Sequence, residues 1–214
     1  GPAPGVAGKA EDQPEGGGWQ EEALTCGGGY AVVEGVFAID SANVYAVGGS
    51  GLVVKRNGMN WECMSPAPTA SGTNLMSVWA SDPANVFVAG GHGAVFHFDG
   101  TTWTDVDSNS NLKFNAVWGA APDDVFAVGL SVLRRGDSTE LLGMKAPVSI
   151  GMFDVYGLAA DDVFAVGKNG TLLYWNGVEW ARWRSDVAYW LRGAWGTPDG
   201  WFFVGDSGTL LHLL

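Results

Sequence analysis

The chain has 214 residues, of which 47% are apolar and 12% aromatic, so it can bury a sizeable core and is not a disordered chain. Acidic residues outnumber basic ones by 23 to 11, which argues against the basic face that nucleic-acid binding requires. No run approaches the roughly 18 apolar residues of a transmembrane helix, so we expect no membrane span and no nucleic-acid partner.

The chain begins with a segment that carries Gly, Pro, Ala and charged residues but no aromatic residue. Residues 1–18 are therefore interpreted as a flexible linker, because they cannot bury a stable face. The dipeptide Gly1-Pro2 is typical of the scar that a cleaved affinity tag leaves. We expect the remainder, residues 19–214, to form a single domain.

The chain has two cysteines, Cys26 and Cys63, which fit either a disulfide or two buried free thiols. Their spacing matches no recognisable metal site, and we expect no metal ion and no other cofactor. A disulfide suits a secreted, periplasmic or cell-surface protein, because such bonds persist in oxidising compartments. We therefore expect a bond between the two cysteines, with their Cα atoms about 4.4–6.8 Å apart.

A unit of about 40 residues recurs five times after this N-terminal region. Each copy contains a lead aromatic residue, a polar turn, an apolar run and then a glycine that follows the lead aromatic by 10 or 11 residues. The lead aromatics are spaced 42, 39, 38 and 39 residues apart and are Phe37, Trp79, Trp118, Tyr156 and Trp195.

Each copy predicts four short strands. The first ends at the lead aromatic, and a turn rich in Pro, Asp or Asn separates it from a second strand of the type Val-Phe-Ala-Val. A glycine hairpin leads to the third strand, and an Asn-Gly or Asp-Gly pair then predicts a further hairpin. A tryptophan opens the outer strand in three copies, as Trp61, Trp103 and Trp180.

Four strands repeated at this period predict an all-β fold, a five-bladed β-propeller with four-stranded blades. The fifth copy stops at Leu213-Leu214 and lacks an outer strand, whereas residues 16–19 match residues 100–103. We therefore expect the N-terminus to supply the outer strand of the last blade. Such a strand would close the ring and protect its open edge.

The unit, read across the copies as VWGxxPDDVFAVGxxGTxxxxxGxxW, resembles short propeller repeats that are abundant in secreted proteins of myxobacteria and related soil bacteria. It also resembles the Asp-box and photosystem II assembly factor propellers, whose hairpins carry an Asp-Gly turn and a following Trp. Asp99 follows Phe98 and Asn176 follows Trp175, so the Ser or Thr of an Asp-box is absent and sialidase-type chemistry is not implied. Over residues 19–214 the resemblance implies binding of glycans or proteins.

Tryptophans that recur in register are expected to pack in the core, and this includes the lead aromatic Trp195. The candidate site consists of residues that break the repeat in the loop before the fifth copy, together with polar residues of the glycine hairpins that open on the same face. An aromatic surface beside a few polar groups suits a ligand, although ordinary surface or packing between blades also explains these residues. The candidate ligand-binding residues are Trp183, Tyr189, Trp190, His92, Lys168, Asn169 and Asp206.

We expect a monomeric, non-catalytic binding module, secreted or surface-displayed, that recognises a glycan or a protein on this loop face. A structural or assembly scaffold with no small ligand is a second hypothesis. A third is a glycosidase, which needs two carboxylates about 5–9.5 Å apart. The carboxylates of this chain are found mostly in the repeated turns at the opposite end of the strands, which disfavours the glycosidase.

Overall fold

The structure, a computed structural model, describes residues 21, 22, 24, 26, 32–58, 60–64, 72–135 and 140–214. The expected linker at residues 1–18 and the segment 16–19 that was expected to close the ring lie outside the described residues. Within the described ranges the regular structure consists of β-strands and short 3₁₀ turns, in agreement with the all-β prediction. No described helix has the length and apolar character that a bilayer crossing requires.

The described strands form antiparallel sheets in which neighbours in sequence are neighbours in space. Blade one contains β1 (Val33–Asp40), β2 (Asn43–Gly48), β3 (Val53–Arg56) and β4 (Trp61–Cys63). Blade two contains β5 (Leu75–Asp82), β6 (Asn85–Gly90), β7 (Val95–Phe98) and β8 (Trp103–Asp105). Blade three contains β9 (Phe114–Ala121), β10 (Asp124–Gly129), β11 (Val132–Arg135) and β12 (Leu142–Gly143). Blade four contains β13 (Met152–Ala159), β14 (Asp162–Gly167), β15 (Leu172–Trp175) and β16 (Trp180–Trp183).

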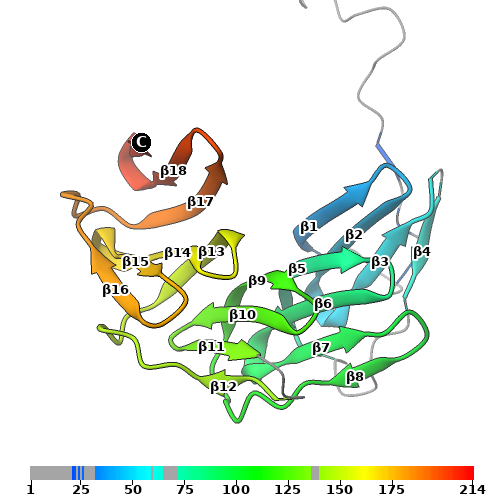
Figure 1. The fold of residues 1–214 in the computed structure, drawn as a ribbon. Coiled ribbons are helices and arrows are strands. Elements are labelled where there is room, and N and C mark those ends of the chain that lie inside the picture. The colour runs from blue at the N-terminus through cyan, green and yellow to red at the C-terminus, as the bar shows by residue number, and fades with distance from the viewer. Residues whose placement is uncertain are drawn as a thin grey trace, which may run out of the picture.

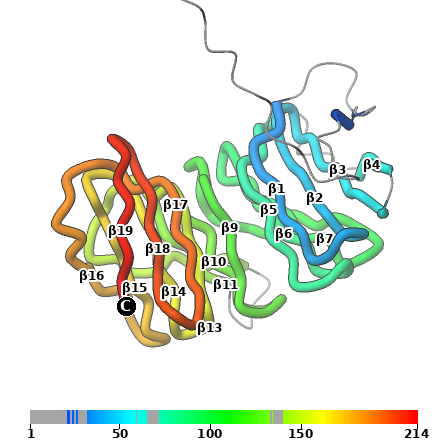
Figure 2. The backbone as a smooth tube through the Cα atoms, turned by 90° about the horizontal axis from the view of Figure 1, so that it is seen from above, coloured from blue at the N-terminus to red at the C-terminus, as the bar shows by residue number. Residues whose placement is uncertain are grey.

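The last repeat forms a sheet of only three strands, which we call the terminal sheet: β17 (Leu191–Thr197), β18 (Gly200–Gly205) and β19 (Leu210–Leu213). The prediction of five four-stranded blades is therefore wrong in its count, because the structure has four complete blades. Figure 1 shows the sheets along an open arc, with β1 at one end and β18 at the other. From above, in Figure 2, the first strands β1, β5, β9, β13 and β17 follow one another along this arc.

The described residues before β1 lie on blade one and not beside β19. Glu22 accepts hydrogen bonds from Arg56 at 3.2 Å and from the indole N–H of Trp61. Leu24 packs against the apolar cluster that contains Cys26 and the outer strands of blade one. The expected closure by an N-terminal strand is therefore not formed by the described residues, which are held by blade one itself.

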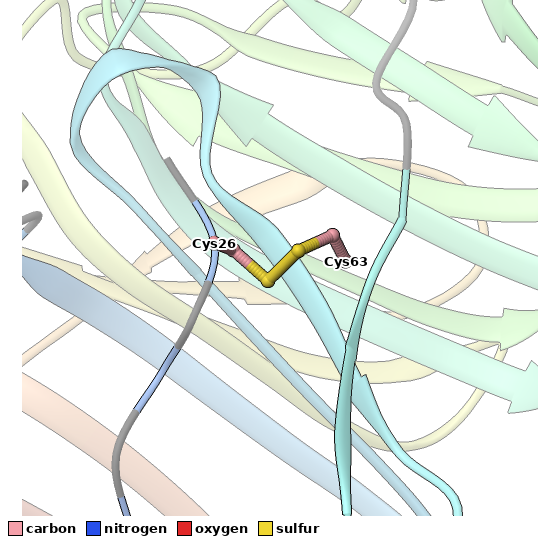
Figure 3. Close-up of a disulfide and its surroundings, with 2 residues drawn as sticks. All are labelled: Cys26 and Cys63. Atoms are coloured by element: carbon pink, nitrogen blue, oxygen red, sulfur yellow. A yellow bond between two sulfur atoms is a disulfide. The ribbon is translucent and has the colours of Figure 1, made fainter. Parts of the chain in front are cut away.

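The predicted disulfide between Cys26 and Cys63 is present, with a Cα–Cα distance of 5.6 Å. Figure 3 shows it joining the N-terminal segment to the strand β4 of blade one. Cys26 is buried and forms one cluster with Ala46, Leu52 and Val54. The disulfide therefore holds Leu24 and Cys26 against one apolar side of blade one.

The core lies at the seams between neighbouring sheets, where lead aromatics meet glycines of the next blade. A Cβ added to Gly119 would lie 2.6 Å from the ring of Trp79, and one added to Gly157 would lie 2.3 Å from the ring of Trp118. Both tryptophans are buried, as expected for residues that recur in register. Because these glycines have no side chain, the two indole rings lie directly against the first strand of the next blade.

Trp195 departs from this pattern, because 59% of its surface is exposed. Its ring stacks on Tyr156 of blade four, with 4.5 Å between the ring centroids. The expectation that Trp195 is a core residue is wrong because, within the described residues, no sheet follows the terminal sheet and covers this ring.

The seam between blade four and the terminal sheet contains a buried carboxyl group, that of Asp154. Its oxygens accept hydrogen bonds from the backbone N–H groups of Val155 and Ala194, each at 2.9 Å. The loss of hydration raises the pKa of Asp154 to about 6, although both hydrogen bonds oppose this increase. At the equivalent position of blade two, Ser77 Oγ accepts the N–H of Val117 at 3.1 Å without any charge.

We expect Asp154 to make the stability of the fold depend on pH. Because its pKa is raised in the folded state, its favourable contribution is present at acidic pH and is lost as the pH rises through about 6. For Asp154→Asn, the free energy of unfolding relative to wild type should therefore improve by about 2 kcal/mol between pH 4 and pH 7. Denaturant titrations of both proteins at several pH values measure this, and parallel curves would contradict it.

Candidate functional site

Two kinds of connection meet at one end of every sheet. In blade four, Met152 at the start of β13 pairs with Gly167 at the end of β14, and in the terminal sheet Leu191 pairs with Gly205. The 3₁₀ hairpins η4 (Lys168–Gly170) and η5 (Asp206–Gly208) follow these glycines directly. The starts of the first strands and the hairpins therefore share one end of the strands, as predicted, and we call this end the hairpin face.

The loop before the terminal sheet is bound to hairpin η4. Gly170 donates its N–H to the carbonyl oxygen of Tyr189 at 2.7 Å, and Ser185 Oγ donates to the carbonyl oxygen of Gly170 at 2.6 Å. A Cβ on Gly170 would lie 1.9 Å from the carbonyl oxygen of Val187, so only glycine fits this contact. Local sequence thus places the loop and its aromatic residues beside the hairpin.

An open cleft of about 400 Å³ lies where this loop meets η4. Asn169 and Trp183 line it, together with Arg182, Arg184 and Asp186. Trp183 is 41% exposed and contacts the rings of Phe164 and Tyr174 edge-on. The cleft therefore contains a tryptophan side chain that is partly packed against blade four, together with charged groups that solvent can reach.

On the other side of the same hairpin, Lys168 lies over Trp190, with its ammonium nitrogen 5.2 Å from the ring centroid. A glycine makes this position possible, because a Cβ on Gly151 would lie 3.3 Å from Cε of Lys168. Trp190 is 36% exposed, so about two thirds of its side chain is covered by these neighbours. Its ring also contacts Phe153, with 5.4 Å between the centroids.

Arg192 completes this cluster and ties it to the terminal sheet. Its guanidinium group lies 4.5 Å from the ring centroid of Phe153 and 4.8 Å from that of Trp190. It also forms two hydrogen bonds with the carboxylate of Asp206, at 2.8 and 3.1 Å. The Arg192 guanidinium holds the pKa of Asp206 below its usual value, and Asp206 raises the pKa of Arg192. Both groups therefore stay ionised, and their opposite charges cancel.

The structure brings six of the seven predicted ligand-binding residues together around η4 and the adjoining seam: Lys168, Asn169, Trp183, Tyr189, Trp190 and Asp206. The seventh, His92, belongs to hairpin η3 (Gly91–Gly93) of blade two and lines a different cleft with Asp105 and Asp107. Asn169 and His92 both have a positive φ, 53° and 55°, so part of their role is to form the turn.

The prediction from sequence missed two members of the cluster, Phe153 and Arg192. Both stand three residues before a lead aromatic, where the other copies have Glu34, Met76 and Asn115. This variability within an otherwise regular repeat is the same signal that pointed to Trp190. Comparing the copies at that position would have revealed both residues.

The opposite end of the strands carries the repeated acidic turns. Asp40 accepts the backbone N–H groups of Ala42 and Asn43, and Asp99 accepts those of Thr101 and Thr102. The side-chain amide of Asn43, followed by the backbone N–H of Ala42, holds the pKa of Asp40 below the usual value for aspartate. The backbone N–H of Thr102 and the hydroxyl of Thr101 do the same for the pKa of Asp99. Both carboxylates thus serve as turn caps. Within the described residues no three His, Cys, Asp or Glu side chains gather into a group that could hold a metal ion.

Repeated four-stranded antiparallel sheets, packed seam to seam along an arc, define this protein as a β-propeller. No protein-family model matches the chain, and no curated protein matches it.

Solved propeller structures are similar to the chain. The WD40 β-propeller domain of Doa1 has 13% sequence identity and a TM-score of 0.65, over 84% of this chain and 67% of that one. YCF48 from Cyanidioschyzon merolae has 18% identity and a TM-score of 0.67, over 91% of this chain and 72% of that one. YCF48 bound to D1 peptide has 13% identity and a TM-score of 0.53, over 89% and 82%. At such identities the likeness establishes the fold alone, that of a β-propeller.

Proposed function

We propose that the chain is a non-catalytic, protein-binding module that uses the hairpin face around η4 to hold a peptide segment of its partner. The observation that carries this proposal is the cluster in which Lys168, Trp190 and Arg192 meet at the seam between blade four and the terminal sheet. The neighbouring cleft adds an exposed tryptophan and further polar groups. Aromatic and arginine side chains supply much of the binding energy in protein interfaces.

A peptide fits this surface better than a neutral glycan. Sugars are commonly held by stacking on an open aromatic ring, but Lys168, Arg192 and Phe153 already contact the ring of Trp190. The likeness to YCF48 bound to D1 peptide adds support, because that propeller takes a peptide. The disulfide supports a secreted or surface-displayed protein of the kind that the repeat resemblance implies.

Selection from a random peptide library displayed on phage tests the function. Selected peptides should bind the purified protein and lose about tenfold in affinity on Tyr189→Ala, because an exposed aromatic residue at the site supplies contact area. Val178→Ala is the matched control, since Val178 is also exposed in blade four but lies in the turn at the opposite end. Failure to select any peptide, or equal effects of the two variants, would reject the proposal.

A further inference from the structure

The charges around η4 do not cancel. Four cations surround the hairpin, and two of them are neutralised locally: Arg192 by Asp206 and Arg184 by Asp186, each with a closest contact of 2.8 Å. Lys168 has no ion-pair partner within the described residues. The surface therefore keeps unsatisfied positive charge on a chain whose net charge is −12.

Arg182 is the second cation that remains unpaired within the described ranges. It lies in β16, beside Trp183, and lines the cleft on the other side of η4 from the Trp190 cluster. One unpaired cation thus belongs to η4 and a second lies in the cleft beside it, where the exposed Trp183 also lies. The exposed Tyr189 belongs to the adjoining loop, whose backbone accepts the N–H of Gly170 in η4. This alternation of positive and aromatic groups suits a ligand in extended form.

Packing holds the ammonium group of Lys168 in place. The stem of the side chain crosses Gly151, and the ring of Trp190 lies 5.2 Å from the nitrogen. The backbone N–H of Lys168 also donates to the carbonyl oxygen of Gly151 at 3.0 Å. An ammonium group held in this way loses little further freedom when it meets an anion, which favours binding.

We propose that the partner of this surface is an acidic protein segment, in which an Asp or Glu carboxylate engages Lys168 and an adjacent aromatic or aliphatic side chain packs beside Tyr189. This inference rests on the proposed function and adds the chemical class of the ligand. The charge complementarity is local to η4, because the cleft beside hairpin η3 contains Asp105 and Asp107, and the turns at the other end of the strands carry Asp40, Asp82 and Asp99. An acidic ligand is therefore attracted to the surface around η4 and repelled from these carboxylates.

The test measures binding of three short fluorescent peptides that alternate tyrosine with glutamate, glutamine or lysine. The glutamate peptide should bind, and the glutamine peptide should bind at least about tenfold more weakly. Lys168→Glu should weaken the glutamate peptide by about tenfold or more, Lys168→Arg should retain it, and added salt should reduce it in wild type. Lys55→Glu is the matched control, because it makes the same charge change on β3 of blade one.

Equal binding of the glutamate and glutamine peptides, or equal effects of Lys168→Glu and Lys55→Glu, would overturn the inference. If library-selected peptides bind at Tyr189 without enrichment in Asp or Glu, the proposed function stands and only the acidic preference fails. If no peptide binds at all, the proposed function itself fails. Binding of an acidic polysaccharide such as alginate in place of every peptide would assign the surface to a different class of ligand.

Discussion

Replacing Trp201 with alanine should lower the free energy of unfolding by about 3–5 kcal/mol. Trp201 lies in β18, is only 7% exposed and contacts Phe164 of blade four edge-on at 4.8 Å between ring centroids. In the preceding seam the equivalent residue, Phe126, is contacted edge-on by Trp180 from an outer strand. Trp201 thus takes over, from a different strand, the contact that an outer-strand tryptophan makes elsewhere.

The matched control is Trp195→Ala in the same sheet, since Trp195 is 59% exposed and its removal leaves no buried cavity. Denaturant unfolding of both variants should show a large loss for Trp201→Ala and a much smaller one for Trp195→Ala. Trp201→Val, which introduces the residue that the other four copies have at this position, should still be destabilising. Equal losses for the two alanine variants would show that Trp201 does not anchor the terminal sheet.

Breaking the disulfide should lower the free energy of unfolding by about 3–4 kcal/mol. The bond joins residues 37 positions apart in sequence and therefore restricts the unfolded chain substantially. It also keeps Leu24 and Cys26 over the apolar side chains of Ala46 and Val54. Loss of the disulfide therefore increases the conformational entropy of the unfolded chain and exposes part of blade one to water.

The measurement compares unfolding of the wild type, with and without reductant, against a variant that carries Cys26→Ser and Cys63→Ser. Reduced wild type and the double variant should unfold at the same, lower denaturant concentration. The double variant itself should be insensitive to reductant, which is the internal control. An unchanged midpoint for wild type under full reduction would contradict the stabilising role of the bond.

The fold was predictable because the turn, strand and hairpin patterns within the copies agreed with one another. Turn caps such as Asp40 and Asp99, apolar second strands and glycine hairpins recur in register, so one copy could be checked against the others. The part that failed was the count of five four-stranded blades, because the last repeat forms a three-stranded sheet within the described residues. The closing strand was inferred from a short match at residues 16–19, which lie outside the described residues. The nearest described side chains do not adjoin the terminal sheet, since Glu22 accepts a hydrogen bond from Trp61 of blade one.

The candidate site was predictable only in part. A break in the repeat marked Trp190 as a candidate site residue, and the structure leaves 36% of it exposed, but its contacts with Lys168 and Arg192 depend on how two sheets meet. That geometry depends on side chains from separate strands, so the sequence of a single copy does not reveal it. His92 was included because of its hairpin, and the structure places it in another blade with different neighbours.

Asp154 gives the last seam a property that the other seams lack. Each sheet contacts its neighbours along the arc. The free energy of packing at one seam therefore acts mainly on the two sheets that form that seam, as in a linear array of repeats. Proton uptake at Asp154 therefore acts on the docking of β17–β19 and leaves the packing among blades one to three unchanged. We therefore expect hydrogen exchange of the amides in β17–β19 to slow on acidification toward pH 5 more than that of blades one to three, after correction for the intrinsic exchange rate.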